Sequence, residues 1–172
     1  MKASLSTWQV AGFGFTGALG TLLHFLYDWT GQSPWVAAFS AVNESTWEHM
    51  KLLFFPMLIF SLVESRFVKK AYPSFWCVKL AGTLLGLVLI PVLYYTYTGA
   101  LGINVDWFNI SIFFITAAVV YRVETALLKS NKLPCPFPRF SLTLLLLIAI
   151  AFAFLTFRPL NIPLFADVAS TG

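Results

Sequence analysis

The sequence has few charged residues, and this scarcity excludes an ordinary water-soluble domain. Only 10% of its 172 residues are Asp, Glu, Lys or Arg, whereas soluble domains contain about 25%. Hydrophobic residues make up 59% of the chain, and its mean hydropathy is +0.80. Such a chain cannot cover a water-facing surface with polar groups, so we expect one all-α integral membrane domain over residues 1–172.

The sequence also lacks the motifs of common enzyme and cofactor classes. Cys77 and Cys135 have no C-x-x-C spacing, which argues against a zinc ribbon or a disulfide framework. No P-loop, dinucleotide fingerprint, G-x-S-x-G or H-E-x-x-H motif is present. The net charge of +4 is interpreted as a signal of membrane orientation. We therefore expect membrane lipids as partners and no nucleic acid, and the sequence leaves a homo-oligomer open.

Five apolar segments are long enough to cross a bilayer, since a span needs about 17–25 residues. They lie at about residues 8–29, 47–63, 76–97, 107–128 and 140–157. Between the first two, Ser33-Pro34 is typical of a helix start, and the short apolar run after it predicts an interfacial or re-entrant helix. The expected architecture is a bundle of five transmembrane helices.

Most basic residues fall on the side of the N-terminus in this topology. Those on that side are Lys2, Arg66, Lys69, Lys70, Lys79, Arg122, Lys129, Lys132 and Arg139, whereas Lys51 and Arg158 fall on the other side. The positive-inside rule then places the N-terminus inside and the C-terminus outside a cell (inner or plasma) membrane. Both cysteines would lie on the cytoplasmic side, where thiols are kept reduced.

Polar residues gather at the outer ends of the first two expected helices. His24 and Asp28 share one helix face, and Glu44, Glu48 and His49 surround the start of the next helix. Imidazoles and carboxylates from neighbouring helices are ligands of zinc and related divalent metals. We predict that His24 and His49 bind a divalent metal, zinc first, with Asp28 as a further ligand. Glu44 is an alternative ligand or a catalytic group, and Glu48 is the candidate general base.

Structural roles compete with this interpretation. Ser45 and Glu48 have the spacing of a capping box, and Lys51 can pair with Glu48 on the helix surface. Each histidine can also hydrogen-bond at the membrane interface, His24 with Asp28 for example. Capping explains Glu48 alone and leaves the remaining polar residues without an explanation.

Two segments resemble a family of small bacterial multi-pass membrane proteins that is known only as a domain of unknown function. They are Leu23–Trp29 and Val42–Pro56, the second of which contains Asn43-Glu44-Ser45-Thr46-Trp47-Glu48-His49. The ending Pro163–Asp167 is similar too, although Arg158-Pro159-Leu160 and Val168 depart from a more proline-rich form. The resemblance covers the whole chain and implies that the outer polar cluster is the family's signature. It implies no activity, substrate or cofactor.

Three functions remain open from the sequence. The first is a metal-dependent membrane hydrolase that acts on a lipid or amphiphile. The second is a cation-binding transporter or channel-like protein, although no charged residue continues the path below His24 until Glu64, Arg122 and Glu124. The third is a non-catalytic scaffold. A haem held by His24 and His49 is a further alternative, which Soret absorption would reveal.

Overall fold

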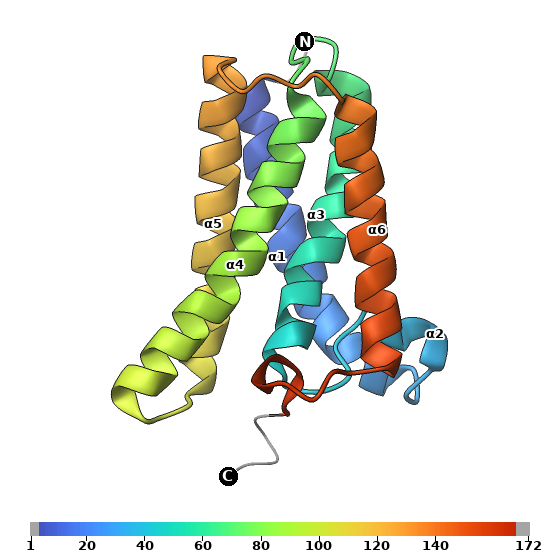
Figure 1. Cartoon of the computed structure of the whole chain (residues 1–172), viewed down its shortest axis with the longest axis vertical. Helices are drawn as coiled ribbons and strands as arrows, with labels where there is room; N and C mark the ends of the chain where they lie inside the picture. The colour runs from blue at the N-terminus through green and yellow to red at the C-terminus, as the bar shows by residue number, and fades with distance from the viewer. Residues whose placement is uncertain (1–3, 168–172) are drawn as a thin grey trace.

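The computed structural model describes residues 4–167, and this part of the chain is helical without a strand. Its elements are α1 (Leu5–Trp29), α2 (Pro34–Ala37), α3 (Thr46–Val68), α4 (Phe75–Leu101), α5 (Asp106–Ser130), α6 (Pro138–Phe157) and the 3-10 helix η1 (Pro163–Phe165). The long helices run side by side along the axis of one bundle (Figure 1). The start of α1 lies at one end of the bundle, and η1 lies at the other.

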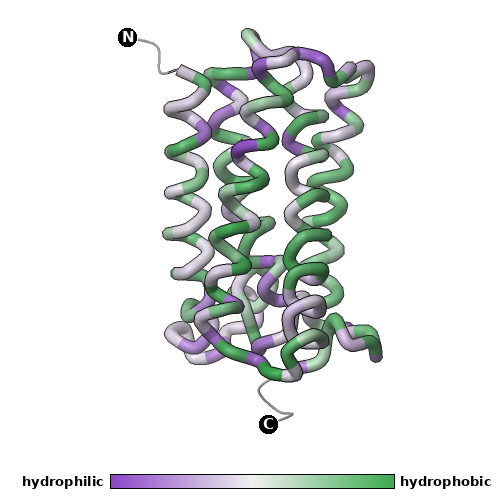
Figure 2. Tube along the Cα trace, turned by 90° about the vertical axis from the view of Figure 1, so that its left-hand side faces the viewer, coloured by the Kyte–Doolittle hydropathy of each residue, from purple (hydrophilic) through white to green (hydrophobic). Residues whose placement is uncertain are grey.

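The composition of the helices is that of a membrane protein. Within residues 4–167, four helices are long and apolar enough to cross a membrane, namely α1, α4, α5 and α6. Figure 2 shows apolar residues along the middle of the bundle and polar residues concentrated towards its ends. Large apolar side chains face outwards on α6, where Leu147, Ile150 and Phe154 are more than half exposed. An apolar outer surface of this kind is stable in lipid but not in water.

The remaining long helix, α3, is packed among the others rather than on the outside. It contacts α1, α4, α5 and α6, and it carries the buried charged residues Glu48, Lys51 and Glu64. Neighbouring helices shield these charges from lipid, so α3 needs less apolar surface than a lipid-facing span. Of the five expected spans, the four around α3 thus have the composition of membrane-crossing helices, and α3 differs by its charge.

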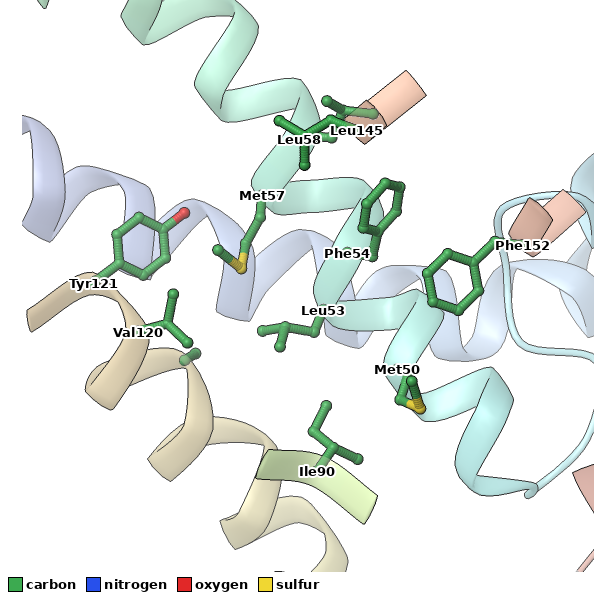
Figure 3. Packing of buried hydrophobic residues seen from close by; sticks show 11 residues of the cluster. Met50, Leu53, Phe54, Met57, Leu58, Ile90, Val120, Tyr121, Leu145 and Phe152 are labelled. Carbon is green, nitrogen blue, oxygen red and sulfur yellow. The ribbon is translucent and has the colours of Figure 1, made fainter. Parts of the chain in front are cut away.

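The largest apolar cluster lies between α3 and the helices around it (Figure 3). Phe54 of α3 is fully buried and packs against Phe152 of α6, with ring centroids 5.0 Å apart. On another side of α3, Met57 points towards Val120 and Tyr121 of α5. These contacts fix the rotation of α3, and therefore the direction in which its polar side chains point.

The connection between α1 and α3 begins as the sequence predicts. Ser33 is the N-cap of α2, and Pro34 occupies the first helical position. The helix ends at Ala37, so it is shorter than the apolar run that extends to Val42. The residues after Ala37 form an irregular segment that returns to α3.

The expectation that both cysteines are free is wrong. Cys77 of α4 and Cys135, in the segment before α6, form a disulfide. The two residues are 58 positions apart in the chain, so no local spacing could indicate the bond. Packing of α4 against α6 brings them together, and Ser141 of α6 also donates a hydrogen bond to the Cys77 sulfur.

Candidate metal site

The side chains of His24, Glu44 and His49 meet at the end of the bundle opposite the start of α1. His24 lies in α1, Glu44 in the segment before α3, and His49 in the first turns of α3. Nε2 of His24 lies 3.5 Å from Oε1 of Glu44, and Nε2 of His49 lies 3.5 Å from Oε2 of the same carboxylate. One ligand atom from each residue lies within 4.8 Å of the others. The structure thus brings together three of the five polar residues that the sequence singled out.

The second ring nitrogen of His49 orients its imidazole. Nδ1 lies 3.0 Å from the carbonyl oxygen of Ser45. A carbonyl oxygen only accepts, so Nδ1 donates the hydrogen of this contact. Nε2, the other ring nitrogen, lies on the side of the Glu44 carboxylate. A backbone carbonyl on the second nitrogen is typical of metal-binding histidines.

The residue types of the group are those that bind zinc, which takes histidine and carboxylate ligands at about 2 Å. The two 3.5 Å separations involve different oxygens of Glu44, so its carboxylate lies between the two imidazoles. The side chains are 22–44% exposed, and the group is therefore accessible from the surface.

Glu44 is suited to bind a cation because it is ionised. Hydrogen bonding from the His24 imidazole holds the pKa of Glu44 below its usual value, and the nearby His49 adds to this effect. Partial burial acts in the opposite direction but does not outweigh it. A carboxyl group must lose its proton to bind a metal, and Glu44 meets this requirement at neutral pH.

The hydroxyl of Ser40 fixes the segment that carries Glu44 against α1. It accepts a hydrogen bond from the N–H of Tyr27 (3.1 Å) and donates one to the carbonyl oxygen of Leu23. Leu23 and Tyr27 are four residues apart, so the hydroxyl joins two groups that a helix normally bonds to each other. The N–H of Ala41 also donates to Leu23. These bonds lie next to His24 and set its position relative to Glu44.

Replacing Ser40 by alanine should lower the free energy of unfolding by about 1–3 kcal/mol, because the half-buried Tyr27 N–H loses its acceptor and the Leu23 carbonyl loses one of its two donors. Unfolding of the purified protein in detergent measures this change. Ser111→Ala, which removes an exposed hydroxyl, serves as the control and should stay within about 0.5 kcal/mol of the parent. Equal stability of the two variants would show that the bridge does not hold the segment.

A glycine one turn before His24 allows the helices to approach closely. A Cβ atom on Gly20 would lie 2.6 Å from the Phe113 ring of α5 and 2.9 Å from the Leu52 carbonyl oxygen of α3. Both distances are too short for a side chain, so only glycine fits between the three helices here. Close contact of α1 with α3 brings His24 within reach of His49.

A pocket of about 730 Å³ opens beside the three side chains. The pocket is lined by α1, α3 and α5 and by the segments before α3 and α5. Its polar lining residues are His24, Glu44, His49, Thr21, Asn104, Asp106 and Asn109. Its other lining residues are Gly20, Phe25, Leu52, Ile110, Phe113 and Phe114. Phe25 and Ile110 are about half exposed on the outer surface of the bundle. The pocket therefore combines the polar group of His24, Glu44 and His49 with an apolar wall that continues onto the outer surface of the bundle.

Asn104 and Asn109 were not singled out from the sequence. The hydroxyl of Tyr97 donates to the side-chain oxygen of Asn109 at 2.5 Å and lies 3.0 Å from that of Asn104. The polar residues at 104, 106 and 109 were the available signal, but nothing in the sequence directs them towards α1.

The structure places Glu48 apart from the three metal-binding candidates. Its carboxylate lies 2.5 Å from Nζ of Lys51 and accepts hydrogen bonds from the Val42 N–H and the Thr156 hydroxyl, each at 3.1 Å. Lys51 also donates to the Ala37 carbonyl oxygen and to Thr156. The pair is buried, whereas the sequence suggested a pair on the helix surface. Glu48 thus connects the segment before α3 to α6, and its role as general base stays a prediction.

Only half of the expected capping box forms. The Glu48 N–H donates to the Ser45 hydroxyl at 3.4 Å, but the Ser45 N–H donates to the side chain of Asn43 rather than to Glu48. Asp28, at the end of α1, is exposed and does not belong to the group of His24, Glu44 and His49. Its role as a metal ligand stays a prediction from the sequence, and Asp28→Ala distinguishes that larger ligand set from the group of three.

A family model described as "Family of unknown function (DUF6512)" matches residues 1–172. No curated protein and no solved structure matches the chain significantly. The match covers the whole chain and agrees with the resemblance carried by Leu23–Trp29 and Val42–Pro56.

Proposed function

The chain belongs to DUF6512, a family of unknown function, and from its geometry we propose that it is a metal-dependent membrane hydrolase. The proposed ligands are His24, Glu44 and His49, the metal is zinc, and the substrate is a lipid or another amphiphile. One observation carries the proposal. Two imidazoles and a carboxylate offer ligand atoms within 4.8 Å of one another, beside a large pocket with an apolar wall.

The residues around the proposed site have distinct roles in such a reaction. Zinc held by three protein ligands would lower the pKa of a bound water to about 7 and polarise a substrate oxygen. The Ser45 carbonyl keeps Nε2 of His49 free to bind. Phe113 and Phe114 provide apolar surface for an acyl chain, and Asn109 offers hydrogen bonds to a head group.

Hydrolysis of nitrophenyl esters by the purified protein in detergent micelles tests this function. We expect faster turnover of a long-chain ester than of a short-chain one, loss of activity on chelation, and recovery with added zinc. His49→Ala should be inactive, whereas Asp28→Ala, which removes an exposed carboxylate outside the group, should keep its activity. Turnover that survives both chelation and His49→Ala would contradict the proposal.

The proposed topology has five membrane passes with the N-terminus inside. α3 is 23 residues long and runs beside the four apolar helices, which supports a fifth pass (Figure 1). The basic segments 66–70 and 129–139 lie at the end where α1 begins, and Lys2, outside the described residues, would add to them. The Cys77–Cys135 disulfide opposes this orientation, because cytoplasmic thiols are kept reduced.

Labelling with an impermeant maleimide in intact cells distinguishes the two orientations. Cysteine is introduced as Lys70→Cys or as Ile103→Cys, at opposite ends of the bundle, in a chain whose own cysteines are replaced by alanine. The proposal predicts labelling of the cysteine at position 103 and none at position 70. The reverse pattern would place the basic end outside, where a disulfide is stable.

A further inference from the structure

A second polar cluster lies in the half of the bundle that is far from His24. Four helices contribute one side chain each, namely Gln9 of α1, Glu64 of α3, Lys79 of α4 and Glu124 of α5. Nζ of Lys79 lies 2.8 Å from Oε2 of Glu64 and 2.6 Å from Oε2 of Glu124. The amide of Gln9 donates to Oε1 of Glu64 at 2.7 Å. We call these four residues the inner cluster.

The inner cluster is closed off from the surface. Glu64 and Glu124 are 0% exposed, Lys79 is 1% exposed and Gln9 is 3% exposed. The rings of Phe75 and Tyr121 each lie 5.4 Å from Nζ of Lys79 and stabilise its positive charge. Among residues 4–167, Lys79 is the cation that pairs with the two carboxyl groups. Tyr121, whose hydroxyl bonds to Thr16, is a further titratable group beside Lys79.

The charges of this cluster do not balance when every group is ionised. Two carboxylates and one ammonium leave a net charge of −1 in a medium of low dielectric constant, and an uncompensated buried charge is strongly unfavourable. The neutral state requires one additional proton on the carboxyl groups. Oε1 of Glu124 is buried and accepts no hydrogen bond from the described residues, so it has room for that proton.

We propose that the inner cluster is a proton-binding site, in which Glu64 and Glu124 share one bound proton while Lys79 keeps its positive charge. The proton comes from water, and one carboxylate becomes a carboxylic acid. The bound proton keeps the contact between α1, α3, α4 and α5 electrically neutral. Gly82 supports this arrangement, since a Cβ atom there would collide with the Glu124 carboxyl group.

Infrared spectroscopy of the purified full-length protein tests the proposal, because a protonated carboxyl group has its own carbonyl stretch. At about pH 8, where exposed carboxyl groups are ionised, the parent protein should show this band. Glu64→Gln and Glu124→Gln should both lack it, since each leaves one carboxylate opposite one ammonium. Asp28→Asn, which changes an exposed carboxylate, should keep the band.

Thermal unfolding gives an independent measurement if one variant fails to fold. The parent protein should lose stability as alkaline pH removes the proton, whereas the two glutamine variants should show no such loss from this cluster. A parent protein without the band, or a band that persists in either folded glutamine variant, would overturn the proposal. Neither result would affect the metal site, which involves other residues.

Discussion

Replacing Lys79 by methionine should lower the free energy of unfolding by about 3–5 kcal/mol, because it leaves two buried carboxyl groups without their cation. The methionine side chain has a similar length, so the loss arises from the charge rather than from a cavity. The two carboxyl groups would then have to take up protons or remain charged in the interior. Denaturation of the purified protein in mixed micelles measures the change.

Two control variants separate the charge from the packing. Lys132→Met changes an exposed lysine and should leave stability within about 0.5 kcal/mol of the parent. Combining Lys79→Met with Glu64→Gln and Glu124→Gln removes every charge in the cluster, so it should recover much of the lost stability. If Lys79→Met is as stable as Lys132→Met, the ion pairs do not hold the helices together.

Zinc should raise the stability of the protein and should do so through His24 and His49. A ligand that binds only the folded state at 100 times its dissociation constant stabilises that state by about 2.7 kcal/mol. His24→Ala and His49→Ala each remove a nitrogen ligand, so the thermal shift should disappear in both variants. Thermal unfolding with and without zinc measures the effect.

Magnesium and Asp28→Ala are the controls for this experiment. Magnesium prefers oxygen ligands, so it should not replace zinc at a site with two imidazoles. Asp28→Ala should keep the full zinc shift, because Asp28 lies outside the group of three. An equal shift in His49→Ala would show that zinc acts elsewhere on the protein.

The helices could be located from the sequence because their apolar runs are long. The segment expected at residues 107–128 is the helix Asp106–Ser130, and that expected at 140–157 is Pro138–Phe157. Three of these four boundaries lie one or two residues further out than expected, since helical hydrogen bonding continues past the apolar run, and the end at Phe157 agrees. The segment expected at 47–63 is the helix Thr46–Val68, whose last turns include Glu64, a charged residue that pairs with Lys79 of α4.

The approach of His24 to His49 was expected because a short connection joins their helices. The sequence could not show which carboxylate lies between them. Glu44 has this position because Ser40 fixes the connecting segment to α1, whereas Glu48 points to Lys51 and α6. Such details depend on side-chain contacts that are far apart in sequence.

The inner cluster could not be predicted from the sequence, because it too depends on contacts between residues that are far apart in the chain. Glu64, Lys79 and Glu124 lie on three different helices, and their pairing depends on the rotation of each helix about its axis. A uniformly apolar span carries little information about that rotation, because most of its faces look alike. The sequence could place these charges at one end of the bundle but could not pair them.

The metal content of the purified full-length protein tests the central claim most directly. After exposure to zinc and removal of loosely bound metal, we predict one zinc per chain in the parent protein and in Asp28→Ala. His24→Ala and His49→Ala should contain none. A parent protein without metal after this treatment, or an unchanged zinc content when both histidines are replaced, would contradict the account.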